Sequence, residues 1–507
     1  MTSKMMIGTS HIFPLPDFQG QFIVSRGDCP TAASATRHCL ETLCVDVFEP
    51  LGRVDVLDAS GRSIGLLLGT VIDTDAEEIL TSSIRLDDSL DQINDIDQWV
   101  EEQIYRLAGS FVFVLDTTFA RRIYLDANGS NSLVYDPQTK TAAATTALLL
   151  DPSAYRKRFD NELYRGLTVD QDGWFPAGLT AHTGIRRLMC NHYLDMVTMQ
   201  TVRHWPAGKI EEAKDLSEPV ALIADKVERT IRAIQRTGLG TMALTAGNET
   251  RLLLGCCRSF AGDIDFVTVK APGAELDVTR SRELARRFDL KHRLLEYVEA
   301  DANGARAWQM RVGHCISGSN MTMHPSVEPL NGRIFIGGLG GEIGRGFLWL
   351  NSEQGIAIDA PGIVSRLKLP QHPLLLKEVQ RWLEPLRHYD SLFLLDLAYM
   401  ELRMSCWAFS QSYAAPRIVE VNPLVSRDIY MAMLSVPPSL RRNNGLIVQG
   451  IQQTWPELLS LPINRYGDWR DRARIARNAM ASPNRAIRKI RQLTSVKLGR
   501  MLARRAE

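Results

Sequence analysis

The sequence lacks the features of membrane, metal-thiolate and secreted proteins. Its 507 residues contain no apolar run that approaches the roughly 20 residues of a membrane-spanning helix. The eight cysteines form no Cys-x-x-Cys pair and have no histidine partner at metal-ligand spacing. Residues 1–20 show no signal-peptide pattern. We therefore expect a cytoplasmic protein without a membrane span, whose thiols are buried and reduced.

The sequence also has little net charge, +1, but this balance hides a basic tail. Residues 469–507 hold twelve Lys and Arg against two acidic residues. Such a tail could contact RNA, a membrane surface or an acidic partner. No aromatic interleaving or base-reading motif accompanies it, so we expect a solvated helix and no nucleic-acid binding. Removing the tail should leave a nucleotide site intact.

The composition, 45% hydrophobic and 23% charged, is typical of a globular protein. The length of 507 residues predicts two or three domains. Residues 1–205 hold short apolar or alternating runs separated by Gly, Asp and Asn, a pattern typical of strands. The runs begin at Met5, Gln21, Val54, Ile64, Ser110 and Arg122. They predict layered sheets.

After a linker over residues 206–220, the pattern changes to strands that alternate with helices. Ser217 is predicted to cap a helix that ends at Gly238. Strands are predicted at 240–244, 264–269, 293–298 and 333–336, helices from 249 and over 277–288, and a largely helical region over 367–466. This alternation favours a parallel sheet with ligands at the C-terminal ends of its strands.

Two loops at such strand ends have the composition of ligand-binding loops. Residues 242–251 join a strand to a helix through Thr245-Ala-Gly-Asn, a turn that points N–H groups and the helix dipole at one spot and suits phosphate. An ordinary strand-to-helix turn is the alternative. The second loop, residues 337–346, is glycine-rich. It is not a dinucleotide fingerprint, because the third glycine of that motif would fall on Ile343.

Both loops resemble those of asparagine synthetases and related ATP pyrophosphatases. The family's Ser-Gly-Gly-x-Asp-Ser loop corresponds to residues 245–250, with Glu249 in the place of Asp, and its Ser-Gly-x-Gly-x-Asp-Glu loop places Glu342 at Asp. The resemblance implies binding of ATP and Mg²⁺, with Glu249 and Glu342 as metal ligands. The implied ATP or pyrophosphate contacts are Leu244, Thr245, Ala246, Gly247, Asn248, Glu249, Thr250, Arg251, Gly338, Gly340 and Gly341.

Residues 1–205 resemble the class II glutamine amidotransferase domain of the same family. The matching segments are Gly109-Ser-Phe-Val-Phe, Asp126-Ala-Asn-Gly, Leu133-Val-Tyr, Gly184-Ile-Arg-Arg-Leu and Asn191-His-Tyr-Leu-Asp. Family glutaminases use an N-terminal Cys, whereas this sequence begins Met1-Thr2 and its first cysteine is Cys29. Thr2 is the alternative nucleophile, but such threonine chemistry belongs to other hydrolases. We therefore expect a non-catalytic domain.

Two segments of the helical region resemble the family's acceptor pocket. Residues 418–424 resemble its Glu-x-Arg-x-Pro-Phe element, which makes Glu420 a catalytic candidate. Residues 394–403 resemble a second pocket segment, although Asp396, Glu401 and Arg403 could equally form an intrahelical charge ladder.

The family's late lysine is missing, because no lysine occurs between Lys377 and Lys489. Arg441 or Arg442 could supply the catalytic cation instead, since arginine binds phosphate bidentately.

The resemblance implies an α+β, Ntn-hydrolase-like domain of layered sheets over residues 1–205. It implies an α/β parallel-sheet ATP-pyrophosphatase domain, adenine nucleotide α-hydrolase-like with a helical C-terminal part, over 206–467, and a basic helical tail over 468–507. The implied activity is ATP-dependent C–N ligation through an acyl-adenylate. The acceptor would be a small-molecule or peptide carboxylate, and the nitrogen would come from ammonia or a substrate amine, as in β-lactam synthetases and lasso-peptide cyclases. A homodimer is left open. The alternative is a pseudoenzyme that serves as a nucleotide-binding or scaffold protein, favoured by Ala246 and the missing lysine.

Overall fold

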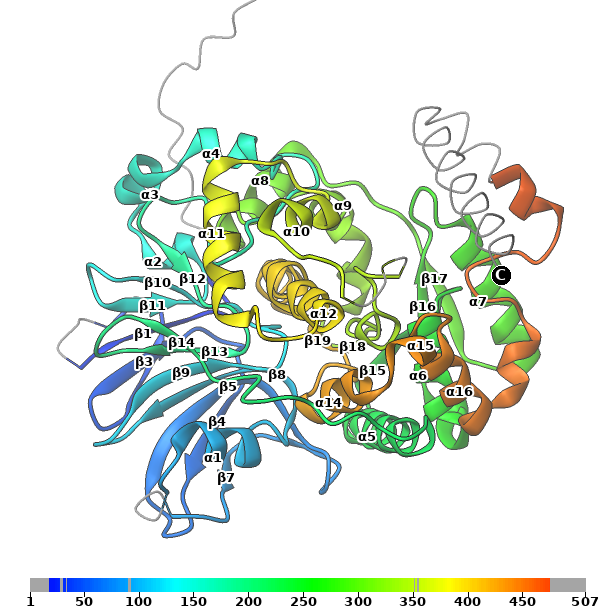
Figure 1. Cartoon of the computed structure of the whole chain (residues 1–507), viewed down its shortest axis with the longest axis horizontal. Coiled ribbons are helices and arrows are strands. Elements are labelled where there is room, and N and C mark those ends of the chain that lie inside the picture. Colours follow the sequence, from blue (N-terminus) through cyan, green and yellow to red (C-terminus); the bar gives the residue numbers. More distant parts are fainter. Residues whose placement is uncertain are drawn as a thin grey trace, which may run out of the picture.

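The computed structural model describes residues 18–474 except 28–30, 33, 90–92, 351 and 353–354. It is a mixed α/β protein with two largely antiparallel sheets and one parallel sheet (Figure 1). The expectations for Thr2, for the run at Met5, for Cys29 and for residues 475–507 of the basic tail lie outside the described residues. Among those described, no helix is long and apolar enough to cross a bilayer.

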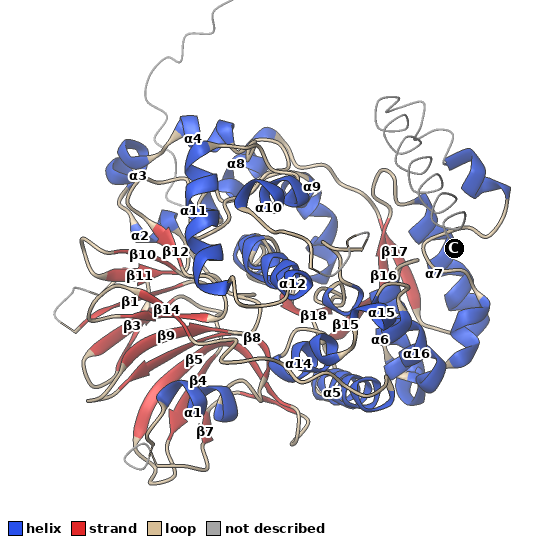
Figure 2. Ribbon diagram, viewed as in Figure 1, coloured by secondary structure: helices blue, strands red, loops and turns tan. Residues whose placement is uncertain are grey.

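The first half of the chain forms the two largely antiparallel sheets. In spatial order the first consists of β12 (Arg186–Arg187), β10 (Val134–Asp136), β11 (Thr141–Ala143), β1 (Phe22–Arg26), β3 (Leu43–Val47) and β2 (Thr36–Cys39). The second consists of β14 (Thr201–Arg203), β13 (His192–Asp195), β9 (Arg121–Leu125), β8 (Ala108–Asp116), β5 (Ser63–Asp73), β4 (Arg53–Leu57) and β7 (Ser83–Arg85), with β6 (Glu78–Leu80) paired to β5. Figure 2 shows these strands gathered in one part of the molecule. The strands predicted from Gln21, Val54, Ile64, Ser110 and Arg122 are confirmed as β1, β4, β5, β8 and β9.

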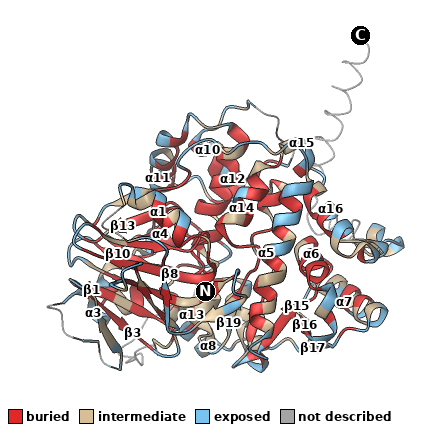
Figure 3. Cartoon of the chain, turned by 90° about the horizontal axis from the view of Figure 1, so that it is seen from below, coloured by how far each residue is buried: buried red, intermediate tan, exposed pale blue. Residues whose placement is uncertain are grey.

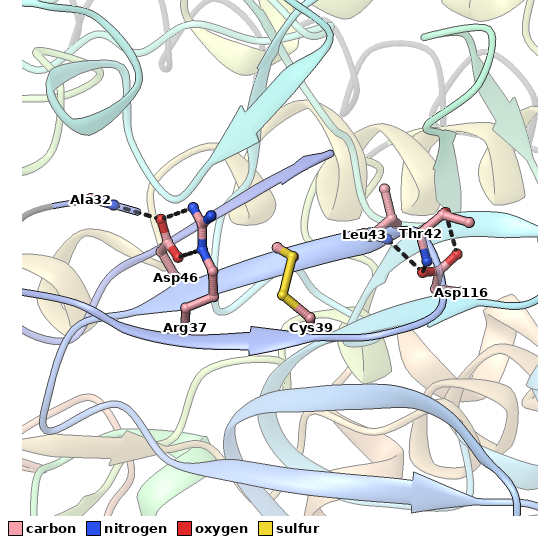
Figure 4. The surroundings of a disulfide bond; sticks show 8 residues. Ala32, Arg37, Cys39, Thr42, Leu43, Asp46 and Asp116 are labelled. Carbon is pink, nitrogen blue, oxygen red and sulfur yellow. Dashed lines mark hydrogen bonds and ion pairs between the residues drawn. A yellow bond between two sulfur atoms is a disulfide. The ribbon is translucent and has the colours of Figure 1, made fainter. Parts of the chain in front are cut away.

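The two sheets are joined by polar contacts as well as by their apolar core. β8 is buried along its whole length, so its terminal carboxylate cannot remain without partners. Asp116 accepts hydrogen bonds from the N–H groups of Thr42 and Leu43, at 2.6 and 2.7 Å, where β3 of the other sheet begins (Figure 4).

The short helices of this half are α1 (Ile96–Gln103), α2 (Thr146–Leu149), α3 (Pro152–Arg158) and α4 (Asn161–Gly166).

Cys39 and Cys44 form a disulfide across the hairpin between β2 and β3 (Figure 4). They are register partners, with Cα atoms 4.2 Å apart. The expectation of reduced thiols is wrong for this pair, because cysteine spacing alone does not reveal the register that sets two side chains opposite each other. Five cysteines are buried free thiols as expected: Cys190, Cys256, Cys257, Cys315 and Cys406.

The second half contains a five-stranded sheet in which every pairing is parallel. Its spatial order is β17 (His292–Leu295), β16 (Asp265–Val269), β15 (Gly240–Ala243), β18 (Ile334–Ile336) and β19 (Val419–Val421). Helices α5 (Ser217–Gln235), α6 (Asn248–Cys256) and α7 (Glu275–Phe288) alternate with the first strands. The four predicted strands and the parallel sheet are confirmed.

Two local expectations in this half are wrong. β19 lies in the region predicted to be helical, because a three-residue strand shows no periodicity and forms by pairing with the free edge of β18. Ser217 is the first residue of α5 rather than its cap, and its own N–H donates to Asp215. The predicted amphipathic pattern of α5 is nevertheless present as one buried and one exposed face (Figure 3).

The remaining helices belong to the second half. The helices are α8 (Ala302–Arg311), α9 (Ser319–Met323), α10 (Ala360–Leu367), α11 (Pro373–Leu383), α12 (Ser391–Leu402), α13 (Ser410–Ala414), α14 (Arg427–Ser435), α15 (Pro438–Arg441) and α16 (Gly445–Thr454). Short 3-10 helices are η2 (Arg258–Asp263), η3 (His324–Leu330), η4 (Ile343–Arg345), η5 (Glu384–Leu386), η6 (Met404–Cys406) and η7 (Pro456–Ser460). Among these helices, α11 and α12 contact the first half.

A buried ion pair joins the two halves. Glu401 of α12 is fully buried and binds Arg203 of β14 through two N–O contacts of 2.7 Å. Its carboxylate also accepts hydrogen bonds from Asn191 and from the indole of Trp382. A carboxylate with this many partners fixes α12 against the second antiparallel sheet.

Candidate active site

The turn between β15 and α6 is held by its own side chains and by α7. The hydroxyl oxygens of Thr245 and Thr250 lie 2.7 Å apart, and the N–H of Gly247 donates to the Thr245 hydroxyl at 3.0 Å. The N–H of Ala246 donates to Asp277 at 2.9 Å. The first N–H groups of α6 have no partner within the helix, so they remain the donors suited to an anion at this turn.

The glycine-rich loop places a second carboxylate beside this turn. β15 and β18 are neighbours in the sheet, with Met242 opposite Ile336, so the loops that follow them leave the same edge. Glu342 is half-buried and accepts a hydrogen bond from the N–H of Gly340 at 3.2 Å. Burial and the negative charge of Glu249 raise the pKa of Glu342. The structure therefore brings Glu249 and Glu342 together, as expected for residues that follow two strands of one parallel sheet.

The glycines of this loop are required for its close approach to α6. A Cβ atom on Gly341 would lie 2.6 Å from Cγ of Glu249, and one on Gly338 would lie 3.0 Å from its Cβ. Gly340 has a φ of 99°, a conformation that favours glycine. Gly338 and Gly341 thus allow the loop to pack directly against Glu249, and Gly340 allows the backbone to turn beside Leu424.

Arg345 is a charged residue of this site that sequence reasoning missed. Its Nε lies 2.9 Å from Oε1 of Glu249, and its guanidinium lies 5.3 Å from the centre of the Phe347 ring. Burial and the charge of Glu342 raise the pKa of Tyr399, which packs against Phe347. The only available signal was a basic residue in the same loop as Glu342. Two carboxylates and one guanidinium therefore meet at this edge of the sheet.

Glu420 lies on β19, opposite Phe335 of β18. Burial raises the pKa of its carboxyl group, which accepts a hydrogen bond from Asn422 at 3.1 Å. Asn422 in turn accepts from the N–H of Leu339 at 3.1 Å, so Glu420 is linked to the glycine-rich loop. It also lines a cavity of about 60 Å³ shared with Ser110 and other residues of the first half.

The two predicted catalytic arginines bind backbone carbonyls within residues 343–352, at the end of the glycine-rich loop and just after it. Arg441 is buried, binds Asp396 at 2.9 Å and donates to the carbonyl of Ile343 at 3.1 Å. Arg442 donates to the carbonyls of Leu350 and Ser352. Arg441 therefore supports the residue that follows Glu342.

The charge-ladder interpretation of α12 is wrong for its two carboxylates, whose partners lie on other elements. Asp396 accepts from the indole of Trp349 at 2.8 Å in addition to binding Arg441, and Glu401 binds Arg203. The guanidinium carbon of Arg403 lies 4.9 Å from the centre of the Trp174 ring, so this side chain also has its partner elsewhere in the chain.

The C-terminal strap, residues 458–467, lies against the turn and was not predicted to belong to the site. The N–H of Asn464 donates to the carbonyl of Ala246 at 2.8 Å. Asp471, within the basic tail, accepts from the N–H groups of Tyr466 and Gly467 at 2.9 and 2.8 Å. Removing residues 469–507 would therefore also remove a brace of the strap, which revises the expectation that this deletion leaves the site untouched.

The acidic pair fits a magnesium ion. Magnesium takes oxygen ligands, usually one or two carboxylates completed by phosphate oxygens and water. Glu249 and Glu342 offer two repelling carboxylates, which a dication would neutralise. In the described part of the chain no group of three or more His, Cys, Asp or Glu side chains could hold a metal by itself. The phosphates of a nucleotide would have to supply the remaining ligands.

No family model matches the chain, and no curated protein matches it either. Its function is therefore inferred from the geometry of this site.

Proposed function

We propose that the protein is an asparagine-synthetase-like, ATP-dependent C–N ligase that activates a carboxylate as an acyl-adenylate. Under this proposal, residues 206–467 are an ATP-pyrophosphatase domain. Residues 1–205 are a non-catalytic, Ntn-hydrolase-like domain of the class II amidotransferase type. The nitrogen comes from ammonia or from an amine on the substrate.

The observation that carries the proposal is the convergence of two acidic loops over the N-terminus of α6. Glu249 and Glu342 follow neighbouring parallel strands, where α/β sheets bind ligands. The hydroxyl groups of Thr245 and Thr250 meet at the same turn. This combination suits a magnesium-polyphosphate better than a neutral ligand, because it joins metal ligands to anion-binding donors.

The reaction would proceed by in-line attack of a substrate carboxylate oxygen on the α-phosphorus of ATP, with pyrophosphate leaving. Glu249 and Glu342 would hold magnesium, which neutralises charge on the phosphate oxygens. Arg345 already lies beside Glu249 and would contribute a second positive charge. An amine then attacks the acyl carbon and AMP leaves. Glu420 is the candidate to accept the proton that the amine loses, because its raised pKa favours proton uptake.

The alternative is a nucleotide-binding or scaffold protein without turnover. Two observations favour it: Ala246 and Gly247 already use their N–H groups within the protein, and Glu249 is already paired with Arg345. A ligand would have to compete with these contacts.

Calorimetry and a pyrophosphate assay separate the two. The ligase is expected to bind magnesium-ATP, to lose that affinity with EDTA, and to release pyrophosphate when a matching carboxylate is added from a panel with ammonia or amines. Binding without pyrophosphate release across the panel supports the scaffold. Absence of binding contradicts the ligase and any nucleotide-binding role, and leaves only a scaffold that does not bind nucleotide.

The Gly341→Ala variant tests the geometry of the acidic pair. The added methyl group would meet Cγ of Glu249 at 2.6 Å and displace that side chain. Overpacking of this kind costs about 1–3 kcal/mol, so we expect magnesium-ATP affinity to fall about tenfold. Gly262→Ala is the matched control, because nothing lies within 4 Å of the Cβ position there. Calorimetry that gives equal affinities for the two variants would contradict the proposed contact.

A further inference from the structure

A fully buried arginine binds the C-terminal strap from α6. Arg251 has no exposed surface, and its Nη1 donates to the carbonyls of Leu458 and Leu461 at 2.8 and 3.1 Å. Its Nε and Nη2 atoms are buried without hydrogen-bond partners among the described residues. Burial and the neighbouring charge of Arg280 lower the pKa of Arg251 to about 10. A desolvated guanidinium that depends on strap carbonyls ties the strap to α6.

A second buried arginine binds the other end of the strap from α7. Arg280 is 2% exposed, and its Nη2 donates to the carbonyls of Arg465 and Tyr466 at 2.9 and 3.1 Å. Its Nη1 pairs with Glu283 on the same helix. Hydrogen bonds from a charged group are about twice as strong as neutral ones. The strap is therefore held at both ends by guanidinium groups from α6 and α7, the helices that precede and follow β16 in the chain.

The middle of the strap contacts the phosphate turn. Asn464 donates its N–H to the carbonyl of Ala246, while the side chains of Asn464 and Arg465 are exposed. Arg251 follows Glu249 by two residues on α6, but its guanidinium points to the strap instead of to the turn. The resemblance implied that Arg251 contacts ATP directly. In the structure its guanidinium binds backbone carbonyls of the strap, so an effect of Arg251 on ATP would pass through the strap.

We propose that Arg251 and Arg280 are positioning residues that hold the strap against the Ala246 turn and thereby set the affinity of the site for the polyphosphate of ATP. The nucleotide part of this proposal rests on the proposed function. Closing the strap keeps the Ala246 carbonyl bonded to the N–H of Asn464, the residue directly before the exposed cation Arg465. Opening it would remove both effects while leaving α6, α7 and the acidic pair in place.

Hydrogen exchange by mass spectrometry on the ligand-free full chain tests whether Arg251 and Arg280 hold the strap, independently of nucleotide binding. In Arg280→Gln, peptides covering residues 458–467 are expected to exchange about tenfold faster, because two charge-assisted hydrogen bonds are lost. Arg280→Lys, which keeps the charge, should restore part of the protection. Arg286→Gln, an exposed arginine on the same helix, should behave like the wild type. Arg251→Lys is a second variant that keeps the buried charge and should open the end of the strap near Leu458.

Steady-state kinetics with magnesium-ATP then tests the nucleotide role. Arg280→Gln should raise the KM for ATP about tenfold with little change in kcat, whereas a merely structural role would lower the melting temperature and leave KM unchanged below it. If hydrogen exchange of residues 458–467 is unchanged in Arg280→Gln, the proposal that Arg280 holds the strap is overturned. An open strap with an unchanged KM overturns its link to the nucleotide. If the wild type does not bind magnesium-ATP, the proposed function fails, but the exchange result still decides whether the arginines hold the strap.

Discussion

Replacing Glu249 or Glu342 by glutamine is expected to lower magnesium-dependent ATP affinity and pyrophosphate release by about 100-fold, the effect of removing one preorganised electrostatic contact. Glutamine keeps the size of the side chain and removes its charge. The two carboxylates follow neighbouring parallel strands, and the charge of Glu249 raises the pKa of Glu342. Because they would hold one ion, the double variant should lose little more than either single variant. Calorimetry with and without magnesium measures the affinities.

Two further variants make this test selective. Glu457→Gln is the matched control, because that side chain is 53% exposed and pairs with Arg258, which is not a residue of the site. Glu249→Gln also frees Arg345 from its ion pair, so Arg345→Gln must be measured in the same series. Recovery of affinity in the Glu249→Gln, Arg345→Gln double variant would assign the loss to a misplaced guanidinium. Unchanged affinity and turnover in either single glutamate variant would remove that glutamate from the site.

Much of the fold follows from local patterns. The runs that became β5 and β8 are long and apolar, and the alternation of strands with helices after residue 217 predicted the parallel sheet. β19 could not be predicted in this way, because its three residues are a strand only through register with β18. The Cys39–Cys44 disulfide has the same origin, since the hairpin register sets the two side chains opposite each other.

The candidate site was predictable only where its residues lie at strand ends. Glu249 and Glu342 were placed together because both follow predicted strands of one parallel sheet and both lie in segments that resemble the loops of one family; β15 and β18 prove to be neighbours. Arg345 and the strap were not predicted, because their partners are distant in the sequence: Arg345 binds a residue 96 positions earlier. Arg441 shows the converse, since the missing family lysine suggested it as the catalytic cation whereas tertiary packing pairs it with Asp396. Long-range pairing of charges has no periodic signature.

The ion pair between Glu401 and Arg203 leads to the second large expected effect, on stability. The side chain of Glu401 is fully buried and that of Arg203 is 16% exposed, at an N–O distance of 2.7 Å. Removing one partner of a buried pair leaves an uncompensated charge, which costs about 3–5 kcal/mol. Exposed pairs contribute far less, about 0–1 kcal/mol. The pair between Arg229 and Asp225, with side chains 38% and 55% exposed, provides the comparison.

Glu401→Gln is therefore expected to lower the free energy of unfolding by about 3–5 kcal/mol, whereas Asp225→Asn should change it by less than about 1 kcal/mol. Urea unfolding at neutral pH measures both. In a double-mutant cycle, Glu401→Gln combined with Arg203→Met should lose clearly less than the sum of the single losses, because no unpaired charge remains. Additive losses would show that the two side chains do not depend on each other.

The same variant has a defined pH dependence. Burial acts to raise the pKa of Glu401, but the charge of Arg203 together with the hydrogen bonds from Arg203 and Trp382 and the charge of His192 outweighs it, and the pKa is lowered in the folded protein. A carboxyl group with a lowered folded pKa contributes stability above its unfolded pKa, about 4.3, and loses it as the pH falls through the folded value. The difference in free energy of unfolding between wild type and Glu401→Gln should therefore be constant from pH 7 to about pH 5 and shrink below about pH 4. Urea unfolding at each pH gives this difference, and Asp225→Asn serves as the baseline. A difference that stays constant down to the acid-unfolding pH would mean that Glu401 remains ionised throughout or does not stabilise the fold through its charge, and one that grows as the pH falls would contradict the lowered pKa.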